Sequence, residues 1–424
     1  MTADAKTSAD TTRGNPVPMH RDEVLTPSDP PLAPDATLPG TAAVSVRRVE
    51  TFVFRAPIDA PVVTSFGEMH SRPAVLVRLE DADGAWGWGE VWCNFPACGA
   101  EHRARLLDTV LTPLLLATPM SSVPETTRAL EAALRTLAVQ TGEWGPLAQV
   151  LAGVDIALWD LAARRAGQPL ARLLGGTNTM RRVPTYASGI NPGDVPRILE
   201  GSRAAGYRAF KIKVGFGHEA DLAALARARA CLAPGERLML DANQAWSGDE
   251  ALRMAEALAA FGPEWLEEPL GADRPLDEWR RLAASSPVPL AGGENLRGTA
   301  AFERAIETGV MQVVQPDICK WGGFTGCLPV ARAVLAAGRR YCPHFLGAGI
   351  GLMASAHLLA AAGGDGLLEV DANPNPLREI LGSPFLPLDS EGRLPLPTTP
   401  GLGVEPDLKA ARPWQTMHLK GGQL

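Results

Sequence analysis

The stretch Ala209–Gly215, AFKIKVG, places two lysines two residues apart in an otherwise apolar run. Side chains at this spacing in a β-strand point to the same side of the strand. Two ammonium groups are rarely buried together, because each would lose its hydration without gaining an opposite charge. Lys211 and Lys213 therefore predict a strand that faces something other than an ordinary apolar core.

Seven other short apolar runs resemble this one, and alanine-rich helical stretches separate them. In chain order the eight runs are VPTYAS, AFKIKV, LMLDAN, EWLEEP, VPLAGGE, MQVVQPD, RYCPHF and GLLEVD. Strands that alternate with helices at this spacing form repeated βα units and a parallel sheet. Eight such units predict the α/β fold class and, within residues 171–372, a (β/α)8-type TIM barrel.

The residues before the barrel predict a separate N-terminal α+β capping domain over 43–170. Its strand patterns are VSVRRVETFVFRAP, AVLVRLEDADG and AWGWGEVW, and helical patterns follow near 100–116, 123–140 and 145–166. Asp83-Gly84 predicts a hairpin turn between the second and third strands. Residues 57–72, between the first two strands, predict a long loop of the kind that serves as a lid or binding element.

The two ends of the chain differ from the rest. Residues 1–42 are rich in proline, alanine, threonine and aspartate without apolar periodicity, which predicts a disordered arm. Residues 373–424 are proline-rich, and we expect this C-terminal segment to pack back on the capping domain and complete it.

Composition indicates a soluble enzyme with a small-molecule substrate. The 424 residues carry a net charge of -7, which gives no reason to expect nucleic acid. The six cysteines form neither CxxC pairs nor a disulfide framework, so we expect reduced thiols in a cytoplasmic protein. The first residues have no apolar core of the signal-peptide kind, and the apolar stretches are too short or too interrupted to span a bilayer. We expect no membrane partner, and a homo-oligomer, because barrels of this kind often assemble.

Ionisable side chains end seven of the predicted strands at intervals of about one βα unit. In chain order they are Lys211 and Lys213, Asp241, Glu267, Glu294, Asp317, His344 and Glu369. This spacing brings them to one face of the barrel, the C-terminal face on which barrel active sites lie.

Three of these residues predict a metal site. A single carboxylate at a strand end can cap a helix or pair with a lysine, but Asp241, Glu267 and Glu294 on successive strands concentrate negative charge that needs a cation. Oxygen ligands without cysteine favour Mg²⁺, with Mn²⁺ second. Glu268 would point away from the site on a regular strand, so we do not expect it to be a direct ligand.

Two further features each allow two interpretations. The glycine run GAGIG at 347–351 can cradle phosphate, or it can form a tight turn into the next helix, which we favour. His70, in the predicted long loop, can contact substrate or lie in solvent. His357, in the helix after the glycine run, predicts packing only.

The motifs KIK, DAN, WLEEP, GEN, QPDICKWGG and PHF resemble, in order and spacing, those of the enolase superfamily, and within it the mandelate racemase/muconate lactonizing enzyme family. The resemblance covers about residues 45–405. It implies that Asp241, Glu267 and Glu294 bind Mg²⁺. Because Asp317 stands where the muconate-lactonising branch would place a lysine, the resemblance favours the mandelate racemase subgroup.

The resemblance also implies roles for the remaining strand-end residues. Lys213 and His344 would be acid/base groups on opposite sides of the substrate, with Asp317 paired to His344. The other implied contacts are Lys211 with the substrate carboxylate, Glu369 with the enolic intermediate and Asn243 with the substrate. Lys213 must be neutral to act as a base, and we expect Lys211 and the metal to disfavour its charged form.

This family resemblance implies Mg²⁺-dependent abstraction of the proton α to a carboxylate, giving an enolate. We expect dehydration of a sugar acid to follow, and the alternative is racemisation or epimerisation of a 2-hydroxy acid. Two hypotheses from other classes are a phosphate-binding barrel that uses the glycine run and a catalytically silent binding protein of the same fold.

Overall fold

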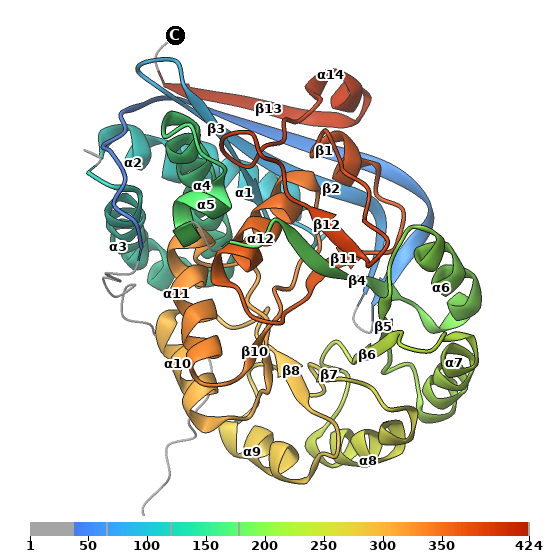
Figure 1. Ribbon diagram of the computed structural model, residues 1–424. Coiled ribbons are helices and arrows are strands. Elements are labelled where there is room, and N and C mark those ends of the chain that lie inside the picture. Colours follow the sequence, from blue (N-terminus) through green and yellow to red (C-terminus); the bar gives the residue numbers. More distant parts are fainter. Residues whose placement is uncertain (1–37, 65–66, 119–120, 177–178, 423–424) are drawn as a thin grey trace, which may run out of the picture.

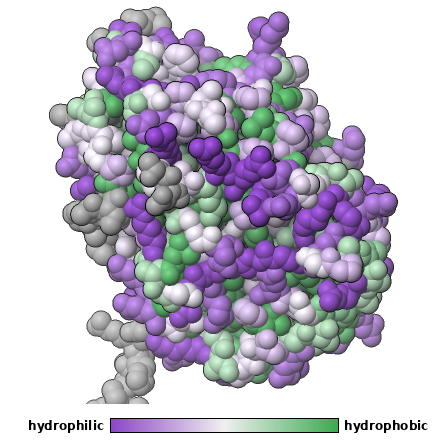
Figure 2. Space-filling view, in the orientation of Figure 1, coloured by the Kyte–Doolittle hydropathy of each residue, from purple (hydrophilic) through white to green (hydrophobic). Residues whose placement is uncertain are grey.

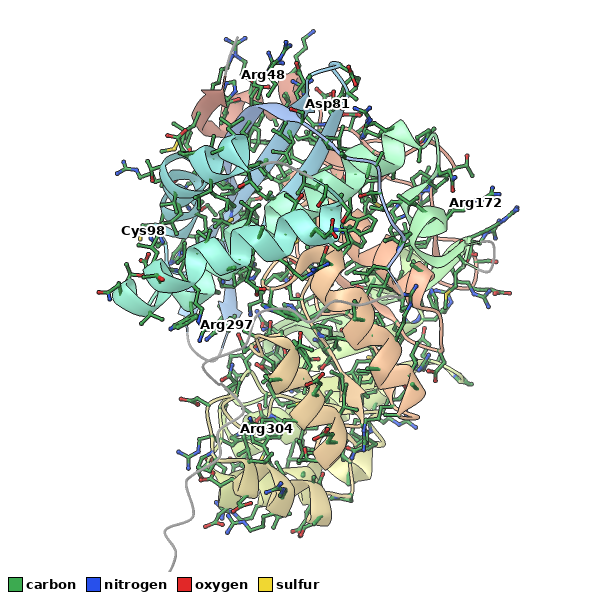
Figure 3. The ribbon with its side chains drawn as sticks, turned by 90° about the vertical axis from the view of Figure 1, so that its left-hand side faces the viewer. Arg48, Asp81, Cys98, Arg172, Arg297 and Arg304 are labelled. Carbon is green, nitrogen blue, oxygen red and sulfur yellow. The ribbon has the colours of Figure 1, made fainter. Side chains whose placement is uncertain are left out.

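The computed structural model describes residues 38–64, 67–118, 121–176 and 179–422. Most of the predicted arm, 1–42, lies outside the described residues. The chain forms a cap built on an antiparallel sheet and a barrel of parallel strands (Figure 1). Figure 3 shows the same arrangement from the side, with Arg48 and Asp81 in the cap and Arg304 in the barrel. Hydrophilic and hydrophobic residues are interspersed on the face seen in Figure 2.

The cap sheet has the strand order β13-β1-β2-β3, with neighbouring strands antiparallel. Its strands are β1 (Val46–Thr64), β2 (Gly67–Asp81), β3 (Trp86–Val91) and β13 (Gln415–Gly422). Asp81 Oδ1 accepts hydrogen bonds from the backbone N–H of Asp83 and Ala85, both at 2.9 Å, which forms the turn predicted at Asp83-Gly84. Pairing of β13 with β1 confirms that the C-terminal segment returns to the cap and completes its sheet.

The prediction of a long loop over 57–72 is wrong. These residues extend β1 and β2 into one hairpin, in which Val62 pairs with Met69 and Pro57 with Ser71. The register shifts between Pro57 and Val62, so the prolines fall at an irregularity, where a strand tolerates a residue that cannot donate a hydrogen bond. Alternating apolar residues on the two arms, Val62 and Met69 among them, are buried, and this burial stabilises extended pairing.

The three helical patterns of the cap are confirmed. The helices are α1 (Gly99–Leu106), the π-helical η1 (Leu107–Leu111), α2 (Thr112–Ala117), α3 (Val123–Thr141), α4 (Trp144–Arg165) and α5 (Leu170–Gly175). α3 starts after Ser122, whose side chain accepts from the Glu125 N–H, and ends at the left-handed Gly142.

Helix α4 is the central helix of the cap. Contrary to our expectation, it is long and apolar enough to cross a membrane, but 89% of its most apolar window is buried inside the molecule. It packs on β3, where a Cβ at Gly89 would overlap the carbonyl oxygen of Gly153. Glycine at these two positions lets the helix and strand backbones approach closely.

The eight predicted barrel strands are confirmed, in the order β10-β9-β8-β7-β6-β5-β4-β11, and neighbouring strands in that order are parallel. They are β4 (Arg182–Ile190), β5 (Ala209–Lys213), β6 (Arg237–Asp241), β7 (Leu266–Glu267), β8 (Leu290–Gly292), β9 (Val313–Val314), β10 (Arg340–Tyr341) and β11 (Leu368–Asp371). β12 (Arg393–Pro395) pairs antiparallel with β4.

Helices surround these strands (Figure 1). They are η3 (Pro192–Asp194), α6 (Val195–Ala204), α7 (His218–Cys231), α8 (Gly248–Leu258), η4 (Ala259–Phe261), α9 (Leu276–Ser285), α10 (Thr299–Thr308), α11 (Gly323–Ala336) and α12 (Gly349–Ala362). The C-terminal segment contributes α13 (Pro376–Ile380), α14 (Leu408–Ala411) and η5 (Arg412–Trp414) before β13.

An apolar cluster separate from the main core lies among the barrel strands. It consists of Tyr186, Ala209, Met239, Trp265, Ala291, Val313, Cys342 and Leu367, all buried. Its members precede the strand-end residues of the site by two or more positions, as with Ala209, Lys211 and Lys213. Because alternate residues of a strand share a side, this cluster underlies the polar groups that follow it along the strands.

Cap and barrel are joined by a buried carboxylate. Asp155 on α4 accepts hydrogen bonds from the backbone N–H of Phe324 at 2.7 Å and of Thr325 at 3.1 Å, which lie in the first turn of α11. Trp159 donates to the Thr325 hydroxyl at 3.0 Å. A carboxylate at a helix N-terminus satisfies N–H groups that have no partner within the helix. These contacts fix the cap relative to the barrel wall.

Candidate active site

A cavity of about 520 Å³ lies where the cap meets the ends of the barrel strands. The cap supplies Val62, Thr64, Trp92 and Phe95 to its wall. The barrel supplies Ser188, Gly189, Lys213, Asp241, Asn243, Gln244, Ala245, Glu294, Asn295, Lys320, His344, Leu346, Glu369, Asp371 and Asn373. A second cavity of about 150 Å³, between α3, α4 and the turn at Trp321, contains none of the predicted strand-end residues.

All the strand-end residues predicted from the sequence come to this end of the barrel. Lys213, Asp241, Glu294, His344 and Glu369 line the cavity itself. Lys211 and Asp317 are buried next to it, in contact with the lining residues Glu369 and His344. Glu267 is buried beside Lys211. The regular βα spacing thus produced the expected convergence.

Lys211 lies below the cavity and not on its wall. Its Nζ donates to Glu267 Oε1 at 2.6 Å and Oε2 at 2.7 Å, and contacts Glu369 Oε1 at 2.8 Å. Burial alone would lower the pKa of Lys211, but the charges of Glu267 and Glu369 outweigh burial and raise it well above its usual value. The predicted contact of Lys211 with a substrate carboxylate is therefore not supported, because the ammonium is only 1% exposed and is already neutralised.

Lys213 has different surroundings. Its Nζ donates a hydrogen bond to Asn243 Oδ1 and lies 3.9 Å from Asp241 Oδ2. Asn243 also donates to Asp241 Oδ2 at 2.9 Å, and its φ of 43° places its backbone in the left-handed region, which asparagine tolerates. Lys213 thus reaches the cavity as one member of a short polar chain.

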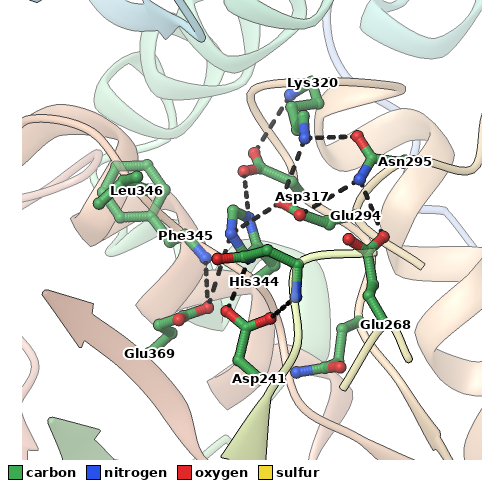
Figure 4. A network of polar contacts seen from close by, with 12 residues as sticks. Asp241, Glu268, Glu294, Asn295, Asp317, Lys320, His344, Phe345, Leu346 and Glu369 are labelled. Carbon is green, nitrogen blue, oxygen red and sulfur yellow. Dashed lines mark hydrogen bonds and ion pairs between the residues drawn. The ribbon is translucent and has the colours of Figure 1, made fainter. Parts of the chain in front are cut away.

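His344 is held from both sides of its ring (Figure 4). Nδ1 lies 2.7 Å from Asp317 Oδ2, and Nε2 lies 2.8 Å from Glu294 Oε2. Burial alone would lower the pKa of His344, but Glu294, Glu369 and the hydrogen bond with Asp317 raise it well above its usual value. Asp317 is fixed in turn, since its Oδ1 accepts from the backbone N–H of Cys319 at 2.8 Å.

Glu369 links the two acid/base regions. Its carboxylate contacts Lys211, lies 3.9 Å from His344 Nε2, and accepts from the Phe345 N–H at 3.1 Å. Ser188 also donates a hydrogen bond to it. Burial would raise the pKa of Glu369, but Lys211 and His344 lower it overall, which favours the carboxylate form.

The expectation that Glu268 points away from the site is wrong. Its φ of 40° breaks the regular strand geometry after β7, and its buried carboxylate accepts from Asn295 at 2.8 Å and from Gln244 at 3.0 Å, both on the cavity wall. Burial, together with the charges of Glu294 and Asp241, raises the pKa of Glu268 well above its usual value. In the described part of the chain, Glu268 forms no ion pair within 4.0 Å.

These carboxylates suit a hard divalent cation in donor type and in charge. Six of them gather here, Asp241, Glu267, Glu268, Glu294, Asp317 and Glu369, against Lys211, Lys213, Lys320 and a protonated His344. Counted in their charged forms, the carboxylates exceed the cations by two. The raised pKa of Glu268 reflects this excess, and oxygen donors favour Mg²⁺. In the described residues no three acidic, histidine or cysteine side chains already surround one point, because Glu267 is turned to Lys211 and Glu294 to His344 and Lys320.

Sequence reasoning assigned no role to Lys320, although it lies in the quoted QPDICKWGG motif. Its Nζ contacts Glu294 Oε2 at 3.1 Å and Asn295 Oδ1 at 2.8 Å, and lies 4.8 Å from the centre of a Trp92 ring of the cap. Burial would lower the pKa of Lys320, but Glu294, Asp317 and Glu268 raise it. The sequence feature that could have identified Lys320 as a site residue is its position three residues after the strand-end Asp317.

The glycine run 347–351 is not a free anion site. Glu90, at the end of β3, accepts from the backbone N–H of Ala348 at 2.5 Å and of Gly351 at 2.7 Å. Burial raises the pKa of Glu90 to about 7, against the opposing effect of these hydrogen bonds. The phosphate interpretation is overturned, since the cap's own carboxylate occupies the amides, and the favoured alternative, a turn into α12, is what the structure shows.

The two remaining histidines lie away from the reacting groups. His70 is 75% exposed on β2 and lies 3.5 Å from Glu68, and it does not line the cavity. His357 is buried in α12, where Nδ1 accepts from the Ala171 N–H at 3.0 Å and Nε2 lies 3.1 Å from the Leu402 carbonyl oxygen. The packing role predicted for His357 is confirmed, and the substrate contact predicted for His70 is not supported.

Known proteins resemble this chain in both sequence and architecture. Two family models match the chain: the enolase C-terminal domain-like model over residues 195–411, and the mandelate racemase/muconate lactonizing enzyme N-terminal domain over residues 48–175. D-galactarolactone cycloisomerase of Agrobacterium fabrum is 32% identical over 378 residues, 85% of this chain and 96% of that protein.

Solved structures agree. A mandelate racemase/muconate lactonizing enzyme from Bordetella bronchiseptica RB50 is 56% identical with a TM-score of 0.82, covering 88% of this chain and 99% of that one. A mutant of L-talarate/galactarate dehydratase liganded with Mg and L-glucarate is 25% identical with a TM-score of 0.76, covering 99% of each chain. The chain therefore belongs to the mandelate racemase/muconate lactonizing enzyme family of the enolase superfamily.

Proposed function

We propose that this protein removes the proton α to the carboxylate of a sugar acid and then expels the β-hydroxyl as water, giving a 2-keto-3-deoxy acid. One observation supports this most strongly. Lys213 ends β5 and His344 follows β10, strands that lie across the barrel from each other in Figure 1, yet both side chains line one cavity. A substrate between them would meet a proton acceptor and a proton donor on different sides.

Lys213 and His344 act in different steps of the proposed reaction. Lys213, as a neutral amine, takes the proton from C2, and the electron pair of the C–H bond passes to the carboxylate as an enolate. His344, which its carboxylate neighbours keep protonated, gives its Nε2 proton to the C3 hydroxyl while the C3–O bond breaks. As the C3–O bond breaks, the enolate electron pair forms the C2=C3 double bond of an enol and water leaves. The enol then gains a proton at C3 and releases the proton of its C2 hydroxyl, which gives the keto acid. Asp317 binds Nδ1 and leaves Nε2, which in this structure contacts Glu294, as the nitrogen that gives its proton to the substrate.

A divalent cation fits this proposal. Asp241, Glu267 and Glu294 would hold Mg²⁺, with Glu268 adding a fourth carboxylate beside them. When bound, Mg²⁺ neutralises the charge that develops on the substrate carboxylate as the α-proton leaves.

The sugar-acid assignment is supported by the neutral polar groups on the cavity wall. Thr64, Ser188, Gln244, Asn295 and Asn373 carry hydroxyl or amide groups that can exchange hydrogen bonds with substrate hydroxyls. Sugar-acid enzymes among the relatives support the same class.

Cycloisomerisation of a sugar lactone is a second candidate, because a galactarolactone cycloisomerase matches 85% of this chain. It begins with the same proton abstraction, and the leaving oxygen is then that of the ring ester. Return of the proton to C2 on the other face would instead give racemisation or epimerisation.

The test is a panel of aldonic acids, aldaric acids, lactones and 2-hydroxy acids incubated with Mg²⁺ in D₂O. We expect deuterium at C2 by NMR and formation of a 2-keto acid, while optical rotation without keto acid would indicate racemisation. Lys213→Ala and His344→Ala should each lose turnover, and the exposed Asp277→Asn should keep it. A folded, Mg²⁺-binding protein that exchanges no substrate of the panel would contradict the proposal and favour the silent binding protein.

A further inference from the structure

The cavity has two chemically different parts. The barrel part carries the ionisable groups at the strand ends, among them Lys213, Asp241 and His344. The cap part is formed by Val62 and Thr64 of β1 and by Trp92 and Phe95 after β3, and none of these is charged. Leu346, in the loop after β10, adds a further apolar side chain.

Every cationic side chain on the cavity wall already faces a carboxylate of the barrel part. Lys320 Nζ lies 3.1 Å from Glu294, His344 lies 2.7 Å from Asp317, and Lys213 Nζ lies 3.9 Å from Asp241. A substrate carboxylate at this end, next to the reacting carbon, would therefore rest on the divalent cation of the proposed function. Among the described wall residues, the cap part offers no cation for a second carboxylate.

A neighbouring residue of the cap does not change this balance. Arg72 of β2 is buried and does not line the cavity, and it already forms an ion pair with Asp371.

From this division, and resting on the proposed function, we infer that the substrate carries a single carboxylate and an uncharged far end, as in an aldonic acid or the monolactone of an aldaric acid, and that Val62, Trp92, Phe95 and Leu346 select against aldaric diacids. A second carboxylate of a diacid would lose its hydration against apolar side chains without gaining a cation. Hydroxyl groups and a lactone ring meet no such penalty, because Thr64 and Asn373 are polar and the aromatic rings pack on C–H groups. Such discrimination is strong when the wrong group is left unpaired in a closed site.

The experiment compares kcat/KM for aldonic acids and lactones with kcat/KM for aldaric acids of the same configuration, using keto-acid formation and deuterium exchange at C2. We expect at least a hundredfold preference for the monocarboxylic substrate. Equal or better turnover of a diacid would overturn the inference and leave the proposed function intact. Exchange with neither class would overturn the proposed function, and the inference with it.

A positive charge introduced into the cap part tests directly whether this wall causes the selectivity. Val62→Arg should reduce the preference at least tenfold by giving a diacid's second carboxylate a partner, while the uncharged control Val62→Met should leave the ratio near that of the parent protein. Circular dichroism and melting temperature establish that each variant folds, and Leu346→Arg serves if Val62→Arg does not. Folded arginine variants with an unchanged ratio would overturn the assignment of selectivity to this wall.

Discussion

Lys211 donates to both carboxylate oxygens of Glu267, at 2.6 and 2.7 Å, beneath the floor of the candidate active site. Two residues further on, Lys213 has no such bidentate partner, lines the cavity and donates to Asn243. The two lysines of the AFKIKVG strand therefore differ in their surroundings. Lys211 is paired with carboxylates of the barrel interior, and Lys213 is the lysine that we propose as the base.

Replacing each lysine with methionine separates these roles. Lys211→Met leaves Glu267 and Glu369 buried without their cation, and we expect it to lower the free energy of unfolding by about 3–5 kcal/mol. Lys213→Met should change that free energy by less than about 1 kcal/mol, because only a hydrogen bond and a distant ion pair are lost. Urea denaturation measures both variants, and equal stability of the two would contradict the distinction.

Binding of Mg²⁺ should increase the free energy of unfolding. Mg²⁺ at about 100 times its dissociation constant should raise the free energy of unfolding of the parent protein by about 2.7 kcal/mol, since the ion binds only the folded state. Asp241→Asn should lose most of this increment, because it removes a charge from the predicted ligand set. Asp277→Asn, whose side chain is 88% exposed on α9, is the matched control and should keep it. Melting curves with Mg²⁺ and with chelator measure the difference.

The sequence predicted the convergence of the site because the strand-end residues follow the βα period. Each unit returns the chain to the same face of the barrel, so residues such as Asp241 and His344 meet although 103 positions separate them in the numbering. It could not predict which charges would pair, because alternation along one strand does not say which group on another strand lies opposite. The family resemblance implies a contact of Lys211 with the substrate carboxylate, and the structure pairs Lys211 with Glu267.

Other features depend on single backbone angles or distant contacts. The φ of 40° at Glu268 turns its carboxylate toward the site, which no period-two pattern predicts. The contact between Glu90 and Ala348 joins residues 258 positions apart, so the glycine run alone could not reveal its partner. The hairpin over 57–72 was mistaken for a loop because its prolines, which usually interrupt strands, fall at a bulge.

The buried His357 should make the fold sensitive to acid. Its Nδ1 accepts from the Ala171 N–H, so protonation would set two N–H groups against each other, and burial lowers its pKa from 6.5 to about 4. Because the folded pKa lies below the unfolded one, this contribution to stability is full above pH 6.5 and is lost as the pH falls towards 4, by about 3 kcal/mol in all.

Replacing this histidine tests the linkage. His357→Gln should remove this contribution to the pH dependence of stability between pH 6.5 and 4. This holds even if the substitution also lowers stability at neutral pH. Melting temperatures of both proteins across this range measure the slope. An unchanged slope would show that other groups cause the acid sensitivity.

The glycines of the run 347–351 should be required for packing and not for binding an anion. A Cβ at Gly349 would lie 2.5 Å from Gly382 Cα and closer still to the Arg378 carbonyl oxygen, and backbone atoms cannot rotate away. We therefore expect Gly349→Ala to lower the free energy of unfolding by more than about 2 kcal/mol, the range of overpacking. Gly201→Ala, in α6 with no atom within 4 Å of the added methyl group, is the matched control and should raise the free energy of unfolding by about 0.5–1 kcal/mol.

Chemical denaturation measures both variants, and inorganic phosphate should shift neither denaturation curve. A stable Gly349→Ala protein, or a phosphate-dependent shift that this substitution abolishes, would restore the anion-binding interpretation that the Glu90 contacts oppose.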